Sequence, residues 1–212
     1  MGIGQSRRAT LSALTITLAA WLSRAGAASA GTPEEAPERF VEVLVARVVA
    51  ALRDQSVGEA QRLDRVDALT AGAFDLARTA RIALGRHWKT APEPERREFA
   101  ALFRAYVLTS YGRRFRQYAD RTFRVTGVEP TGEDVVVASL VEGGTTPIRL
   151  HWRLARNGEG WRVLDVLVEG VSLLVTFRNE FAAVIERHGG RVAGLLDELR
   201  QRVAAERAQL AG

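Results

Sequence analysis

The hydrophobic pattern has a period of two between residues 122 and 168 and a helical period on both sides of that block. Four strands are predicted within it, at residues 122–128, 134–141, 148–155 and 161–168. The third strand alternates strictly, because Ile148, Leu150, Trp152 and Leu154 share one face and Arg149, His151 and Arg153 the other. Short glycine-containing turns separate the strands, which favours an antiparallel meander.

Apolar residues at helical spacing flank the strands. Helices are predicted over residues 38–53 and about 69–84, then after Thr90, and again over about 171–187 and 191–208. The helix after Thr90 has the clearest apolar stripe, formed by Phe99, Leu102, Phe103, Tyr106, Val107 and Tyr111. Helices before and after a strand block predict an α+β fold with helices packed on one face of an antiparallel sheet.

The first thirty residues have the three parts of a removable export signal. Arg7 and Arg8 form a basic start, residues 9–22 are mostly apolar, and Ala28-Ser29-Ala30 fits an A-x-A cleavage site. The apolar run is shorter than the roughly 20 residues of a membrane-spanning helix. We therefore expect cleavage, one working domain of residues 31–212 and a periplasmic location. The arginine pair suggests the twin-arginine export route, with the general secretory route as the alternative.

Charge and cysteine content restrict the function further. Three of the 30 basic residues lie in the leader, which leaves 27 basic against 25 acidic residues in the working domain. This near balance argues against nucleic-acid binding, which needs a clustered basic face. The chain has no cysteine, so an exported domain must be held together by its core alone.

Motifs for catalysis or metal binding are missing from the sequence. The three histidines are not spaced as metal ligands, and no nucleophile elbow, P-loop, dinucleotide fingerprint or zinc-protease motif occurs. Asp165 and Glu169 form one candidate acid–base pair, although the turn signal at Glu169-Gly170 favours a structural role for both. We therefore predict no enzyme activity, no cofactor and no metal site.

Aromatic and aliphatic residues are instead abundant on the predicted inward faces. Two interpretations are open: an ordinary filled core, or a cavity between sheet and helices that binds an apolar ligand. The pattern of residues does not separate a filled core from a hollow one.

Two longer segments carry a family resemblance. The first starts at Gly85-Arg-His-Trp88 and continues through Phe99 and Phe103 to Tyr111. The second starts at Trp161 and contains Glu169-Gly-Val-Ser172-Leu, followed by Arg178-Asn-Glu180-Phe181, and it is the more specific of the two. Both resemble the MlaC family of periplasmic phospholipid carriers and its toluene-tolerance relatives, over nearly the whole chain after the leader.

The resemblance implies a curved four-stranded antiparallel sheet packed against several helices, a cone of the NTF2-like kind that encloses an apolar pocket. Members carry phospholipid between an outer-membrane lipoprotein complex and an inner-membrane ABC transporter with an MCE-domain partner, a role in outer-membrane lipid asymmetry. The same partners are therefore expected here, and nucleic acid is not. Some relatives belong to hopanoid pathways, so a hopanoid carrier is one alternative. An interaction module that carries no lipid is another.

The predicted inward faces give a candidate pocket wall of ten residues. They are Phe99, Phe103, Tyr106, Val107 and Tyr111 of the long helix, Leu150, Trp152 and Val163 of the sheet, and Leu174 and Phe177 of the next helix. A one-residue error in register would move the strand members to the opposite face. The arginines that border the long helix's stripe either meet anionic head groups or partner proteins or form a solvated face: Arg104, Arg113, Arg114 and Arg116.

Overall fold

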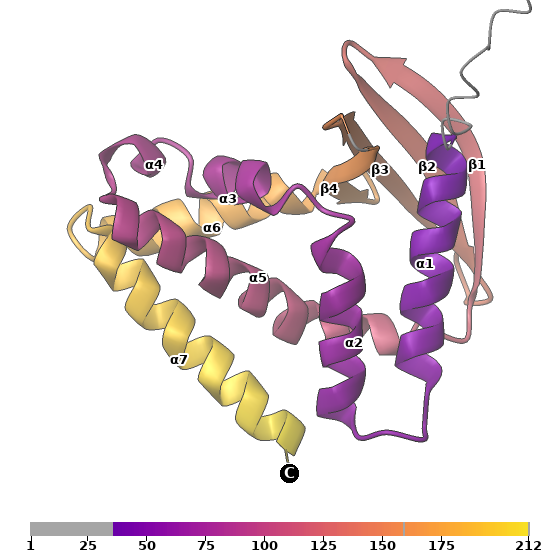
Figure 1. The fold of residues 1–212 in the computed structure, drawn as a ribbon, viewed down its shortest axis with the longest axis horizontal. Coiled ribbons are helices and arrows are strands. Elements are labelled where there is room, and N and C mark those ends of the chain that lie inside the picture. The colour runs from indigo at the N-terminus through magenta and orange to yellow at the C-terminus, as the bar shows by residue number, and fades with distance from the viewer. Residues whose placement is uncertain (1–35, 159, 212) are drawn as a thin grey trace, which may run out of the picture. The chain divides into compact units, whose positions relative to one another are not determined.

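Helices precede and follow an antiparallel sheet in the structure, a computed structural model (Figure 1). It describes residues 36–158 and 160–211, without the side chains of residues 111–116, 210 and 211. The predicted signal peptide, residues 1–30 with its arginine pair, lies outside the described residues. The predicted α+β fold class is confirmed. No helix in the described part of the chain is both long and apolar enough to span a membrane.

The sheet is a meander in which each strand pairs with its neighbours in sequence. Its strands are β1 (Thr122–Thr131), β2 (Asp134–Glu142), β3 (Ile148–Arg156), β4 (Trp161–Val168) and β5 (Val171–Ser172). The first four are the predicted strands, some longer than expected at their ends. The fifth was expected to be the start of a helix, but it pairs with Leu167 and Val168 at the end of β4.

One face of the sheet is covered by α1 (Pro37–Arg53). Val41 and Leu44 of this helix pack against Val137 of β2 and Leu154 of β3, and all four side chains are buried. Leu154 belongs to the apolar face predicted for β3, so α1 accounts for the strict alternation in that strand.

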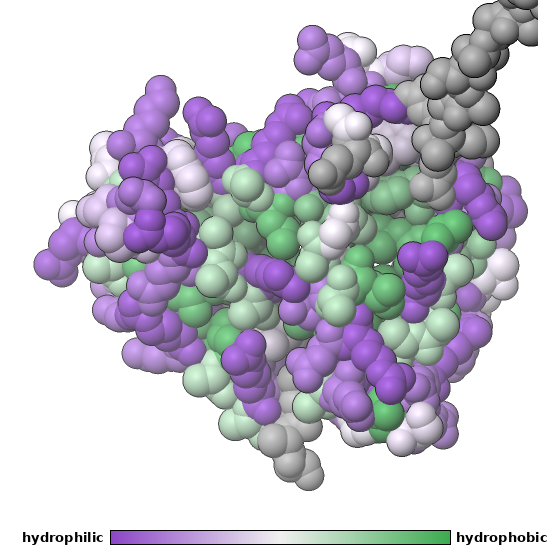
Figure 2. All heavy atoms as spheres, in the orientation of Figure 1, coloured by the Kyte–Doolittle hydropathy of each residue, from purple (hydrophilic) through white to green (hydrophobic). Residues whose placement is uncertain are grey.

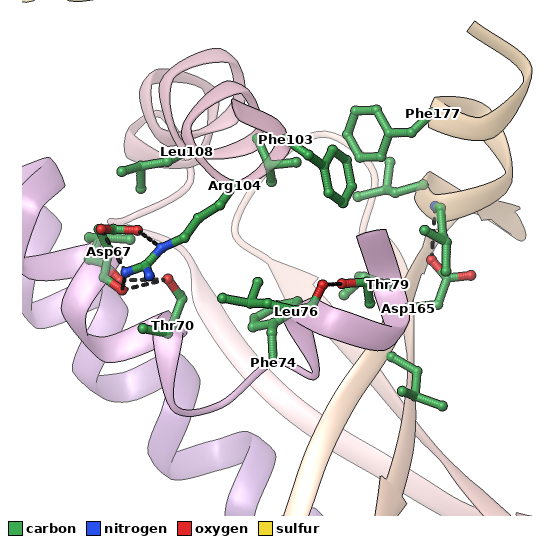
Figure 3. A pocket seen from close by; sticks show the side chains of 17 residues that line it. Asp67, Thr70, Phe74, Leu76, Thr79, Phe103, Arg104, Leu108, Asp165 and Phe177 are labelled. Carbon is green, nitrogen blue, oxygen red and sulfur yellow. Dashed lines mark hydrogen bonds and ion pairs between the residues drawn. The ribbon is translucent and has the colours of Figure 1, made fainter. Parts of the chain in front are cut away.

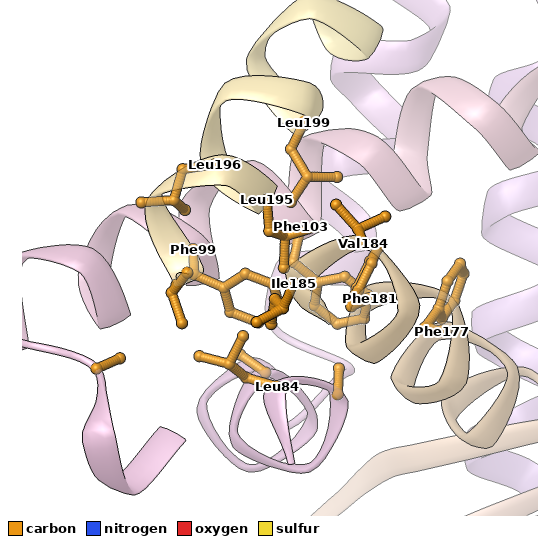
Figure 4. Close-up of a cluster of buried hydrophobic side chains, with 14 of the residues drawn as sticks. Leu84, Phe99, Phe103, Phe177, Phe181, Val184, Ile185, Leu195, Leu196 and Leu199 are labelled. Carbon is orange, nitrogen blue, oxygen red and sulfur yellow. The ribbon is translucent and has the colours of Figure 1, made fainter. Parts of the chain in front are cut away.

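A second core lies among the helices that follow α2 (Glu59–Ala71), and it does not depend on the sheet face under α1 (Figure 4). Its rings come from Phe99, Phe103, Phe177 and Phe181, whose contacting centroids lie 5.3–5.9 Å apart. These separations are those of favourable stacked and edge-to-face pairs. The contributing helices are α3 (Leu76–Leu84), α4 (His87–Thr90), α5 (Glu93–Arg116), α6 (Leu173–Arg187) and α7 (Val192–Ala211).

The prediction of one continuous helix over about 69–84 is wrong, because α2 ends at Ala71 and α3 starts at Leu76. The Asp75 carboxylate caps α3 by accepting a hydrogen bond from the Arg78 N–H at 2.9 Å. The backbone between the helices pairs with β4, because the Val163 N–H donates to Ala73 O at 2.8 Å and the Asp75 N–H to Val163 O at 3.1 Å. This short bridge brings α2 and α3 to the edge of β4.

Candidate functional site

An open cavity with mostly apolar walls lies where α2, α3, α5 and α6 meet β4 (Figure 3). Its volume is about 160 Å³. Phe103 and Phe177 form the wall on the side of the helical core, and Leu164 and Val166 form the wall on the side of the sheet. The cavity therefore occupies the seam between the two cores. In Figure 2, hydrophobic side chains are visible in the middle of the face shown, with hydrophilic ones mostly around its rim.

Four residues of the predicted pocket wall line this cavity: Phe103, Val107, Leu174 and Phe177. They come from α5, which has the clearest apolar stripe in the sequence, and from α6. Tyr111 is also on α5, but its side chain lies outside those that the structure describes.

Phe99 and Tyr106 lie in the helical core rather than in the cavity wall. Phe99 is fully buried between the rings of Phe103 and Phe181. The Tyr106 hydroxyl donates to Glu180 Oε1 at 3.3 Å, and Arg202 Nη1 donates to the same oxygen at 2.5 Å. Burial of the ring, followed by the Glu180 charge, raises the pKa of Tyr106 above its ordinary value. Tyr106 therefore joins α5 to α6 and α7.

The three sheet residues of the predicted wall do not line the cavity. Val163 is fully buried in the core under α1, and Trp152 packs against that core. Leu150 lies two residues from Trp152 in β3 and shares its face. Val163 and its β4 neighbour Leu164 are both buried, and a register shift between Arg153 and Leu154 of β3 leaves Leu164 as the extra residue of β4.

The cavity contacts β4 at Leu164 and Val166, and neither is among the predicted wall residues. A signal for them exists in the sequence. Residues 163–168 are apolar except for Asp165, and a near-continuous apolar run is typical of a strand covered on both faces. Asp67 of α2 was also missed, because residues 59–68 have a polar sequence and were not predicted as a helix, and Thr70 was not selected because it is polar.

The charged groups in the wall all have partners within the protein. Arg104 and Asp67 form an ion pair between α5 and α2, with Arg104 Nε donating to Asp67 Oδ1 at 2.6 Å. The Asp165 carboxylate accepts hydrogen bonds from the α6 N-terminus. No group of three or more potential metal-ligating side chains occurs among the residues that the structure describes.

Asp165 and Ser172 join β4 to α6. The Ser172 hydroxyl donates to Asp165 Oδ2 at 2.5 Å and accepts from the Val175 N–H at 2.9 Å, so Ser172 is the N-cap of α6. Asp165 Oδ1 accepts from the Leu174 N–H at 3.0 Å. Both carboxylate oxygens thus accept hydrogen bonds from groups at the start of α6. The structural role that the sequence favours for Asp165 explains its position.

Replacing Ser172 by alanine is expected to lower the free energy of unfolding by about 1–2 kcal/mol, because the α6 N-terminus loses its cap. Urea denaturation measures this change. Thr176→Ala is the matched control, since Thr176 is exposed and its hydroxyl donates to the main-chain oxygen of Ser172, which the Ser172→Ala change leaves in place. Equal stability of Ser172→Ala and the wild type would contradict the capping role.

Glu169 also has a structural role, in the turn between β4 and β5. Its backbone has a φ of 49°, in the left-handed region that non-glycine residues seldom adopt. The side chain holds the turn to β3, because Oε1 accepts from the Arg149 N–H at 2.6 Å and Oε2 from Arg149 Nη2 at 2.9 Å. The main-chain N–H first, and the guanidinium second, hold the pKa of Glu169 below its ordinary value.

A carboxyl with a lowered pKa stabilises the folded state above its unfolded pKa, about 4.3, and loses that contribution as the pH falls through the folded value. We therefore expect Glu169→Gln to show a smaller drop in Tm between pH 7 and acid pH than the wild type. Calorimetry at both pH values measures the two drops. Glu129→Gln, at an exposed position on β1, is the control. An unchanged pH dependence in Glu169→Gln would contradict the assignment.

Comparison with known proteins agrees with this geometry. Residues 42–201 match the family described as MlaC protein. The chain belongs to the MlaC family. Among MlaC relatives, the intermembrane phospholipid transport system binding protein MlaC of Haemophilus influenzae is 21% identical over 112 residues. That match covers 50% of this chain and 52%, about half, of the relative.

A solved structure extends the MlaC comparison over the fold. The phospholipid-binding protein from Ralstonia solanacearum, in complex with a phospholipid, is 29% identical with a TM-score of 0.72. The likeness covers 82% of this chain and 98% of the Ralstonia chain. The MlaC resemblance of the sequence and the fold that it implies are therefore confirmed.

Proposed function

We propose that this MlaC-family protein is a periplasmic phospholipid carrier that holds acyl chains in the cavity between β4 and the helices. One observation carries the proposal: a relative with the same fold, alike over 98% of its own length, was solved with a bound phospholipid. The working domain is residues 31–212, released from the predicted leader. Its partners are an outer-membrane lipoprotein complex and an inner-membrane ABC transporter with an MCE-domain component.

The chemistry of the cavity supports this role. An acyl chain of roughly fifteen methylenes costs on the order of 12 kcal/mol to expose to water, at about 0.8 kcal/mol per methylene. A lipid therefore crosses an aqueous space only when its tails are enclosed. Side chains such as Phe103, Val107 and Leu164 provide an apolar lining for the tails.

The size of the cavity indicates how lipid is admitted. Its volume of about 160 Å³ is below the roughly 300–1,000 Å³ of sites that enclose drug-sized ligands. Acyl chains must therefore push the lining side chains apart. The cavity lies between two separately packed cores, one in the helices and one under α1, so the seam can widen when one core moves relative to the other. An open apolar seam also favours a carrier over an interaction module with a filled interior.

Lipid extraction from protein purified from its native periplasm tests the proposal. We expect mass spectrometry to find phospholipid in a fixed ratio to the protein, and the purified protein to move labelled phospholipid from donor to acceptor vesicles. Protein that retains no lipid, even after refolding in the presence of phospholipid, would contradict a carrier function.

A further inference from the structure

One cation lines the cavity within the described part of the chain, and it is Arg104. Its side chain is 37% exposed, so it lies where the apolar wall meets solvent. In Figure 3, Arg104 and Asp67 occupy one end of the cavity, and Phe177 and Asp165 lie toward the other. A lipid whose tails filled the apolar part would place its polar end here.

Asp67 holds the guanidinium of Arg104 by one edge. Nε donates to Asp67 Oδ1 at 2.6 Å, and Nη2 donates to Oδ2 at 2.7 Å and to the main-chain oxygen of Asp67 at 3.3 Å. A guanidinium has five N–H donors in a planar fork. Nη1 makes no hydrogen bond to any residue that the structure describes, so its two N–H groups are free to bind an anion.

The other polar side chains of the wall are committed to the fold. The hydroxyl of Thr70 donates to Val66 O at 2.8 Å, and that of Thr79 to Asp75 O at 2.8 Å. The Asp165 carboxylate caps α6 with both of its oxygens. Arg104 is thus the wall residue with free donors for a ligand, and those donors select an acceptor that carries negative charge.

We propose that Arg104 binds the phosphodiester of the carried lipid, with Asp67 as the positioning residue that fixes the fork at the cavity mouth. The assignment rests on the proposed carrier function and adds to it the residue that recognises the lipid's phosphate. An apolar wall alone does not distinguish two lipids with the same acyl chains. A charge-assisted hydrogen bond does, and it favours lipids with a phosphate beside the glycerol over neutral lipids such as diacylglycerol or a phosphate-free hopanoid.

A competition experiment measures this preference. Delipidated protein is equilibrated with equal amounts of phosphatidylglycerol and of diacylglycerol with identical acyl chains, in detergent micelles, and the bound lipids are counted by mass spectrometry. Arg104→Gln is expected to lower the ratio of bound phosphatidylglycerol to diacylglycerol about tenfold, the effect of losing one charge-assisted hydrogen bond at a half-exposed site. Arg104→Lys is expected to keep part of the preference, because it retains the charge without the fork.

The matched control is Arg97→Gln on the same helix. Arg97 is exposed and pairs with Glu93 one turn earlier, away from the cavity. Its replacement should leave the lipid ratio at the wild-type value. Circular dichroism and the total amount of bound lipid verify that each variant is folded.

Asp67→Asn separates phosphate binding from a merely structural ion pair. If Arg104 binds phosphate, the amide oxygen in Asp67→Asn still accepts one bond from the guanidinium and keeps it in place, while the competing negative charge is gone. The preference for phosphatidylglycerol is then kept or raised, whereas Arg104→Gln loses it. If the pair only joins α2 to α5, both variants lose stability alike and neither changes the ratio, which would overturn the assignment.

Three further outcomes are distinct. Excess inorganic phosphate should not displace the phospholipid, because it brings no acyl chains to the cavity; displacement would identify a free-anion site and overturn the proposal. Wild-type protein that binds both lipids equally would refute the role of Arg104 and leave the carrier function intact. Wild-type protein that binds neither lipid would refute the carrier function itself.

Discussion

Replacing Val107 by arginine is expected to abolish phospholipid binding while the protein stays folded. Val107 lines the cavity from α5 and is half-buried, so the longer side chain can reach solvent in the empty protein. With acyl chains in place the guanidinium would be enclosed without a partner, at an effective cost of several kcal/mol. We therefore expect the lipid content of the purified protein to fall at least about a hundredfold, since each 1.4 kcal/mol is a factor of ten.

The control for this variant is Ala101→Arg, which adds the same charge at an exposed position of α5 outside the cavity wall. It should bind lipid as the wild type does. Phe103 is a less useful test site, because its ring belongs to the helical core as well as to the cavity, and a charge there would unfold the protein. A folded Val107→Arg protein with wild-type lipid content would show that the acyl chains lie elsewhere.

Replacing Phe181 by alanine is expected to cause the largest loss of stability. The ring is fully buried and lies 5.6–6.0 Å, centroid to centroid, from the rings of Phe99, Phe103, Phe177 and Tyr106. Removing a buried aromatic ring costs about 3–5 kcal/mol, because the transfer free energy is lost and a void remains. Urea denaturation should show this loss of free energy. Thermal denaturation should show a fall in Tm of roughly 6–20 °C for a chain of this size.

Val175→Ala is the matched control on α6, since Val175 is 41% exposed and its truncation should change the free energy of unfolding by less than about 0.5 kcal/mol. Phe181 does not line the cavity. The Phe181→Ala variant should therefore bind lipid whenever it is folded. A loss below about 1 kcal/mol would mean that the helical core repacks around the gap or contributes little to stability.

The elements with a regular period were predictable from the sequence. The β3 alternation and the α5 stripe each reflect one covered face, which is the condition under which periodicity reports structure. The break between α2 and α3 was not predictable, because the backbone at residues 73–75 is satisfied by Val163, far along the chain. Local spacing contains no information about such a distant partner.

The site was predictable in part, for the same physical reason. The helix positions Val107 and Phe177 lie in the cavity wall because α5 and α6 have one well-defined inner face. The sheet residues that line the cavity were not predictable. The reason is that β4 has buried side chains on both faces, and its register shift changes which residues point to each face. An apolar residue gives the same sequence pattern whether it lines a cavity or fills a core. Phe99 illustrates this, because it was predicted in the pocket wall and is fully buried in the helical core.

Locating the acyl chains tests most directly whether they lie in the cavity between β4 and the helices. A phospholipid with a photoreactive group at the end of one acyl chain is bound to the protein, crosslinked by light and mapped by peptide mass spectrometry. If the tails occupy the cavity, crosslinks are expected in its wall on α5, β4 and α6, at residues such as Val107, Leu164 and Phe177. Crosslinks confined to the sheet face under α1, at Leu150 or Trp152, would contradict this location.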